Sequence, residues 1–121
     1  ENAPDRALEQ FRAVVTIATT QRLSTDGPHA AFLLERLLVK TYDNLGNAWQ
    51  MKKDYRASLP WYHKALSLDP DHMLTNYNIA TAYHMLGEYE KAYKFYRNTL
   101  RINPNYEKAN RNIARIKRYI Q

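Results

Sequence analysis

A pattern of residues that recurs every thirty-four positions is the strongest constraint on the fold of this chain. Small residues recur at Gly46, Ala80 and Ala114, and each directly follows an aliphatic residue. The Asp-Pro pair at 69–70 and the Asn-Pro pair at 103–104 keep the same offset. Because this period is the length of one supersecondary unit, the chain is predicted to be a stack of similar units.

Helices are the expected secondary structure, because apolar residues recur three or four positions apart and Pro or Gly separates the runs. The expected helices span about residues 4–23, 28–52, 54–68, 74–86, 89–102 and 106–121. No breaker interrupts residues 28–52, so a leading segment is expected to continue into the first repeat as one helix. Asp54 is expected to cap the next helix, and Pro60 is expected to kink it by removing a backbone donor.

Two stretches of the repeat resemble a known family. LGNAW followed by DYRASLPWYHKALSLDP, and IATAY followed by GEYEKAYKFYRNTLRINP, are similar to tetratricopeptide repeats. The resemblance implies an all-α fold, a right-handed α-solenoid of antiparallel helix pairs that binds other proteins. It divides the chain into a non-repeat helix pair at 1–38, repeats at 39–72 and 73–106, and a capping helix or truncated third repeat at 107–121.

The recurring residues are expected to form the core of the stack. Gly46, Ala80 and Ala114 are small where two helices must approach closely. Larger recurring side chains, including those of Tyr62 and Tyr96, are expected to fill the space between helices rather than to form a ligand surface.

The first helix of each repeat lines the concave groove in the resembled family, so its exposed side chains are the expected partner contacts. They form three rungs, one per helix, whose members lie three or four residues apart. The candidate partner-binding residues are Asn44, Asn47, Tyr77, Asn78, Thr81, His84, Lys108, Arg111, Asn112, Arg115 and Arg118.

Asn44, Asn78 and Asn112 form a row, because they recur at the repeat offset. An Asn amide both donates and accepts hydrogen bonds, so such a row could pair with the backbone of an extended peptide. The alternative is that these amides only bond neighbouring helices.

The C-terminal quarter of the chain carries the net charge of +6. Residues 97–121 hold 7 Lys or Arg against 1 Asp or Glu, whereas the remainder is balanced. Four of these cations are expected on one helix face: Lys108, Arg111, Arg115 and Arg118. Such a face would pair with the carboxylates of an acidic partner, and the alternative is a solvated capping face.

One variant of this hypothesis is the carboxylate clamp by which some members of the family grip the acidic C-terminal tails of chaperones. Asn47, Asn78 and Lys108 stand at matching places. Asp43 and Asn112 stand where that clamp has cations, and an acidic Asp43 would repel a terminal carboxylate. The clamp is therefore the weaker hypothesis.

No catalytic, metal or cofactor site is expected. The chain has no Cys, its 4 His residues have no metal-ligand spacing, and it contains no nucleophile-elbow or phosphate-loop motif. Nucleic acid is a weak candidate partner, because most of the domain is electrically balanced, and no apolar run is long enough to span a bilayer. The compartment stays open, with the cytoplasm as the default, since a removed leader would leave no trace.

The sequence therefore predicts a non-catalytic interaction scaffold or adaptor. Its concave groove is expected to hold an extended or helical, acidic segment of a partner protein. The structural alternative is self-assembly, in which the C-terminal helix and the N-terminal helix pair dock on neighbouring copies.

Overall fold

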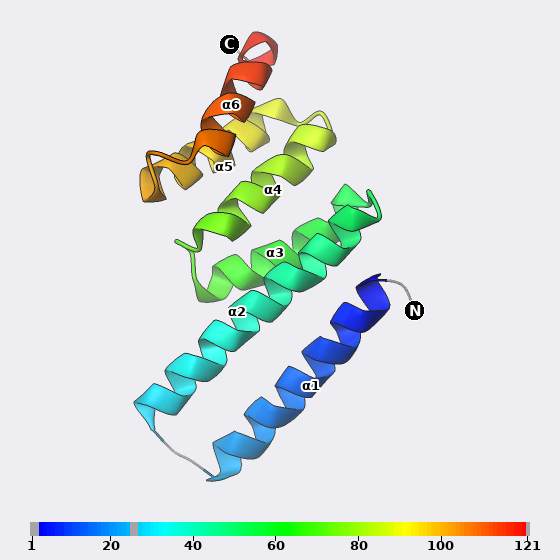
Figure 1. Cartoon of the computed structure of the whole chain (residues 1–121), viewed down its shortest axis with the longest axis vertical. Helices are drawn as coiled ribbons and strands as arrows, with labels where there is room; N and C mark the ends of the chain where they lie inside the picture. Colours follow the sequence, from blue (N-terminus) through cyan, green and yellow to red (C-terminus); the bar gives the residue numbers. More distant parts are fainter. Residues whose placement is uncertain (1–2, 25–26, 121) are drawn as a thin grey trace.

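The computed structural model describes residues 3–24 and 27–120, and within these ranges every regular element is helical. The elements are α1 (Ala3–Ser24), α2 (Pro28–Met51), α3 (Tyr55–Leu68), α4 (Met73–Met85), α5 (Tyr89–Ile102), α6 (Glu107–Ile116) and a 3₁₀ turn, η1 (Lys117–Tyr119). Each helix packs mainly against its neighbours in sequence, with the α1–α2 hairpin at one end and α6 at the other (Figure 1). This arrangement confirms the predicted all-α solenoid.

The helix boundaries follow local signals in the sequence. Asp54 caps α3 as predicted, because its carboxylate accepts the N–H of Ala57 at 3.2 Å. Pro60 is exposed, and α3 continues through it as a single helix.

The third unit differs from its prediction. The helix α6 ends at Ile116 and tightens into η1, so Arg118 does not lie on α6. Within η1, the ring of Tyr119 stacks on that of Tyr89 with 4.4 Å between centroids. The prediction that four cations share one helix face is therefore wrong for Arg118.

The turn after the first helix of each repeat uses left-handed backbone at equivalent positions. Gly87 has φ +78°, and Lys53, which lies one repeat earlier, has φ +62°. Glycine adopts this conformation without strain, whereas a side chain at Cβ makes it unfavourable by about 1–2 kcal/mol. The first repeat therefore contains a strained turn that the second repeat avoids.

Replacing Lys53 with Gly is expected to raise the free energy of unfolding by about 0.5–1 kcal/mol, because the relief of strain outweighs the added flexibility of the unfolded chain. Urea denaturation measures this change. The matched control is Lys52→Gly, because Lys52 has φ −86° and gains nothing from glycine. Equal effects of the two substitutions would show that the left-handed turn is not the cause.

Repeat-matched residues form the core as predicted, with one exception. Tyr62 and Tyr96 are fully buried, and a Cβ on Gly46 would lie 2.7 Å from Cζ of Tyr62, so glycine permits the close approach of α2 and α3. Ala80 is likewise buried, but Ala114 is exposed. No described helix packs over that side of α6, so the expectation of a buried Ala114 is wrong.

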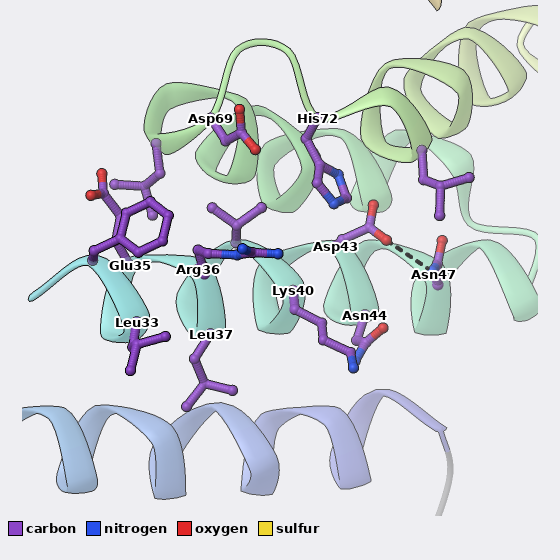
Figure 2. A pocket seen from close by; sticks show the side chains of 14 residues that line it. Leu33, Glu35, Arg36, Leu37, Lys40, Asp43, Asn44, Asn47, Asp69 and His72 are labelled. Atoms are coloured by element: carbon purple, nitrogen blue, oxygen red, sulfur yellow. Dashed lines mark hydrogen bonds between the residues drawn. The ribbon is translucent and has the colours of Figure 1, made fainter. Parts of the chain in front are cut away.

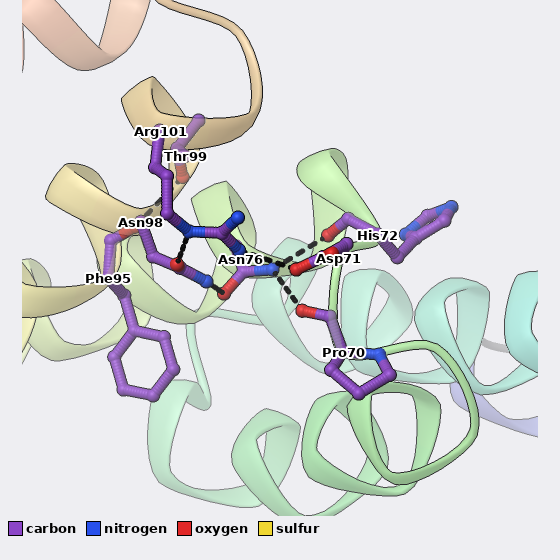
Figure 3. Close-up of polar contacts among 8 residues, drawn as sticks. All are labelled: Pro70, Asp71, His72, Asn76, Phe95, Asn98, Thr99 and Arg101. Atoms are coloured by element: carbon purple, nitrogen blue, oxygen red, sulfur yellow. Dashed lines mark hydrogen bonds and ion pairs between the residues drawn. The ribbon is translucent and has the colours of Figure 1, made fainter.

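A polar network ties the α3–α4 loop to α5, and sequence reasoning missed it. The buried amide of Asn76 donates to the carbonyls of Pro70 and His72 at 3.1 and 3.0 Å, and its oxygen accepts from Asn98 at 2.7 Å (Figure 3). Arg101 adds an ion pair to Asp71. These bonds hold the entrance of α4 against the end of α5.

The N-terminal part of α2 projects beyond α3. The helix α2 has 24 residues and α3 has 14, so α3 covers only the C-terminal part of α2 as it runs back along it (Figure 1). Leu33 and Leu37, on this projecting part, are 52% and 40% exposed. Their spacing is that of a helix, as predicted for residues 28–52.

Candidate partner-binding groove

The structure brings the first helices of successive units side by side along one face. The Gln50 side-chain amide on α2 donates to the backbone carbonyl of Asn78 on α4 at 2.9 Å. The Asn112 amide on α6 donates to the hydroxyl of Tyr77 on α4 at 3.1 Å. We call this side of α2, α4 and α6 the first-helix face. Every candidate residue except Arg118 lies on one of these three helices, and Arg118 lies on η1.

Asp43 is the hub of the first-helix face between α2 and α4. Its carboxylate is only 7% exposed. It accepts hydrogen bonds from the Thr75 hydroxyl at 2.8 Å and from the amides of Asn78 at 3.2 Å and Asn47 at 3.4 Å. Sequence reasoning treated Asp43 as an acid that faces a ligand, whereas the structure buries it. Its donors satisfy the charge and join the two helices.

Asn47 is also engaged inside the protein. Its side-chain oxygen accepts the hydroxyl of the buried Tyr62 at 2.6 Å. Burial, and then the charge of Asp43, raise the pKa of Tyr62, so this hydroxyl stays protonated and remains a donor. The contact connects α3 to the polar hub.

The predicted Asn row therefore has members in two different environments. The amides of Asn78 and Asn112 bond neighbouring helices, and Asn112 in addition accepts the Arg115 guanidinium at 2.9 Å. Asn44 is exposed. Two of the three side chains thus make the inter-helix bonds of the alternative interpretation, and only Asn44 projects into solvent.

His84 and Thr81 complete the middle rung. Both side chains are half-buried. Nδ1 of His84 lies 3.0 Å from the hydroxyl of Tyr96. The Thr81 hydroxyl donates a hydrogen bond to the backbone carbonyl of Tyr77 at 3.0 Å. Burial, followed by the positive charge of Arg115, lowers the pKa of His84. Burial is also the main cause that raises the pKa of Tyr96 to about 12. The lowered pKa favours the neutral form of the His84 imidazole.

The cations of α6 form no ion pair within the described part of the chain. Lys108, Arg111 and Arg115 are exposed, and in the part of the chain that the structure describes no carboxylate lies within ion-pair distance of them. Arg118 is separate from this group, because its guanidinium donates to the hydroxyl of Tyr119 at 2.8 Å. Three exposed cations on α6 are thus left without an ion pair among the described residues, and the acid on that helix is Glu107, in its first turn.

A hollow of about 850 Å³ lies at the opposite end of the first-helix face, along α2. Asn44 and Asn47 line it together with the projecting part of α2 and the start of α4. Figure 2 shows Leu33 and Leu37 on the side of α2 nearer α1, and Asp69 and His72 on the opposite wall. Sequence reasoning did not find this hollow, because its walls come from α2, the end of α3 and the start of α4, which are distant in sequence.

The described residues include neither a cluster of metal ligands nor a helix that could span a membrane. Within residues 3–24 and 27–120, no three His, Asp or Glu side chains cluster as metal ligands would. No described helix has both the length and the apolar character of a membrane span.

Comparison with known proteins gives the family. Two family models described as tetratricopeptide repeat match residues 39–72 and 75–106. The fold is also similar to a crystal structure of MamA, with a TM-score of 0.60, 20% sequence identity, and coverage of 88% of this chain and 68% of that chain. At that identity the likeness shows the fold alone. No curated protein matches the sequence.

These matches cover more than half of the chain, which therefore belongs to the tetratricopeptide repeat family. Repeats of this family generally mediate protein–protein interaction and scaffolding, and the proteins that contain them are typically non-catalytic interaction modules.

Proposed function

We propose that this chain is a non-catalytic interaction scaffold whose first-helix face binds an acidic segment of a partner protein. The observation that carries the proposal is the group Lys108, Arg111 and Arg115, three exposed cations on α6 with no carboxylate partner in the described chain. Like charges this close repel one another, and carboxylates of a ligand would relieve that repulsion while forming charge-assisted hydrogen bonds.

The polar groups beside these cations support an anionic ligand. The Asn112 amide donates to the hydroxyl of Tyr77 and its oxygen accepts from Arg115, and burial lowers the pKa of His84 on α4. An arginine fixed by a hydrogen bond loses less side-chain entropy when it binds a carboxylate. Asp43, the buried acid between α2 and α4, is already satisfied by three donors, and Glu107 at the start of α6 forms no ion pair with a described cation.

The double charge reversal Arg111→Glu with Arg115→Glu is expected to weaken binding of a Glu-rich peptide by at least about tenfold. Fluorescence anisotropy of a labelled peptide measures the change, and circular dichroism checks that helical content is retained. Raising the salt concentration is expected to weaken binding to the wild-type protein more than to the variant.

The matched control is Lys94→Glu with Arg97→Glu, which makes the same change in net charge on exposed residues of the second helix α5. This control is expected to lower peptide affinity far less, because its charges lie outside the first-helix face. An equal loss in both variants would indicate unspecific attraction to a basic protein. Unchanged affinity in the Arg111/Arg115 variant would contradict the proposal.

A further inference from the structure

The hollow along α2 is lined by four exposed, large apolar residues. Phe32, Leu33 and Leu37 are 53%, 52% and 40% exposed on α2, and Leu74, at the start of α4, is 47% exposed. All four line the same hollow of about 850 Å³, which is large enough for several side chains of a ligand. Exposed apolar residues gathered in one hollow are typical of an interaction site.

The hollow is continuous with the first-helix face. Asn44 and Asn47 belong to the first rung and also line the hollow, so a ligand bound across α2, α4 and α6 extends directly into it. Leu33 and Leu37 lie one helical turn apart on the projecting part of α2. A straight apolar stripe of this kind matches the anchors of a helix lying along it.

Charge at the hollow favours an acidic flank on that helix. Arg36 and Lys40 are exposed on α2 and line the hollow, and no ion pair to either occurs among the described carboxylates. The guanidinium of Arg36 lies 5.7 Å from the ring centroid of Phe32, so it borders the apolar surface directly. Asp43 also lines the hollow, but it is buried and its carboxylate already accepts three hydrogen bonds.

Two further carboxylates limit where that acidic flank can lie. Glu35 is exposed toward the start of α2, and Asp69 is half-buried on the opposite wall (Figure 2). Acidic ligand groups are therefore expected next to Lys40, on the side toward Asn44, and not beside Glu35. The ligand's apolar groups cover the remaining surface of the hollow.

We infer that the hollow receives an amphipathic helix of the partner protein, joined to the acidic segment that binds the α6 end. Its apolar side chains pack on Leu33, Leu37 and Leu74, and its acidic flank faces Arg36 and Lys40. This inference rests on the proposed function and makes the ligand bipartite. The apolar part supplies binding that is insensitive to salt, whereas the acidic part supplies binding that salt weakens.

Three synthetic peptides test the inference. The first peptide is the acidic segment alone. The second peptide adds to it a helix of about eighteen residues, with Leu on one face and Glu along its flank. The third peptide is the second with Ser in place of those Leu residues. The variant Leu33→Asn with Leu37→Asn is expected to bind the second peptide at least about tenfold more weakly and the other two with unchanged affinity. The matched control is Val15→Asn with Ile17→Asn, at positions on α1 that are 40% and 47% exposed and outside the hollow.

The outcomes separate the inference from the function on which it rests. Equal affinity of the second and third peptides for the wild-type protein overturns the inference, while binding of the acidic segment alone that is at least about tenfold weaker in the Arg111/Arg115 variant upholds the proposed function. Light scattering identifies a different occupant: if the wild-type chain alone forms dimers that the Leu33/Leu37 variant abolishes, a second copy fills the hollow and the inference is overturned. A monomeric protein with Leu-dependent peptide binding supports it.

Discussion

Replacing Gly46 with Val is expected to lower the free energy of unfolding by about 3 kcal/mol. A Cβ at this position would lie 2.7 Å from Cζ of Tyr62 and closer still to two other carbons of the same ring. Tyr62 is fully buried and its hydroxyl is bonded to Asn47, so the ring cannot move aside without breaking that bond. The helices α2 and α3 would have to separate, and the core between them would lose its packing.

Urea denaturation followed by circular dichroism measures this loss. The matched control is Ala31→Val, which places the same side chain at an exposed position of the same helix. The control is expected to lower stability by less than about 1 kcal/mol, through helix propensity alone. If Gly46→Val were as mild as this control, the close approach of α2 to α3 at Gly46 would not be present in solution.

Replacing Asp43 with Ala is expected to lower the free energy of unfolding by about 3 kcal/mol. The substitution removes the common acceptor of Thr75, Asn78 and Asn47, and leaves their donors without it at a buried junction. A buried donor that loses its acceptor also loses contact with water. The cost of leaving it unsatisfied is larger than the net stabilisation that its hydrogen bond gave. The junction joins α2 to α4, so the loss falls on the contact between the first two repeats.

Denaturation in urea also measures this change, with Glu35→Ala as the control. Glu35 is an exposed carboxylate on the same helix, and its removal is expected to alter stability by less than about 0.5 kcal/mol. A double-mutant cycle with Thr75→Val isolates the Asp43–Thr75 bond, since the two changes should be less than additive. Strict additivity would mean that this hydrogen bond contributes nothing to stability.

The fold was predictable because its signals are local or strictly periodic. Asp54 is a capping residue directly before an apolar helical pattern, and Gly87 marks the turn between two such patterns. Gly46 and Ala80 are small residues in equivalent places, and the structure buries both. Each of these inferences needed only near neighbours in sequence or the same place in the next repeat.

The candidate site was less predictable, because its polar groups find partners far away in sequence. The acceptor role of Asp43 depends on Thr75 and Asn78 in the next repeat, and the position corresponding to Asp43 in that repeat is Tyr77. Periodicity therefore gave no sign that an acid was needed there. A single sequence identifies the helix that carries such a residue, but not the donors that satisfy it.

Two features depend on how neighbouring helices pack and end. Leu33 and Leu37 follow a helical apolar pattern, yet on the side of α2 nearer α1 they stay 52% and 40% exposed (Figure 2). Arg118 was placed on the helix of Arg115, and the 3₁₀ turn at the end of α6 moved it away. The pattern of a single helix contains neither kind of information.

The central claim, that an acidic segment binds the first-helix face, is tested most directly by titrating the isotope-labelled protein with the Glu-rich peptide and following backbone amides by NMR. The account predicts that the largest shifts occur at Asn78, His84, Arg111 and Arg115, on α4 and α6. Shifts concentrated at Lys94 and Arg97 on α5, or spread evenly over the exposed cations, would contradict it.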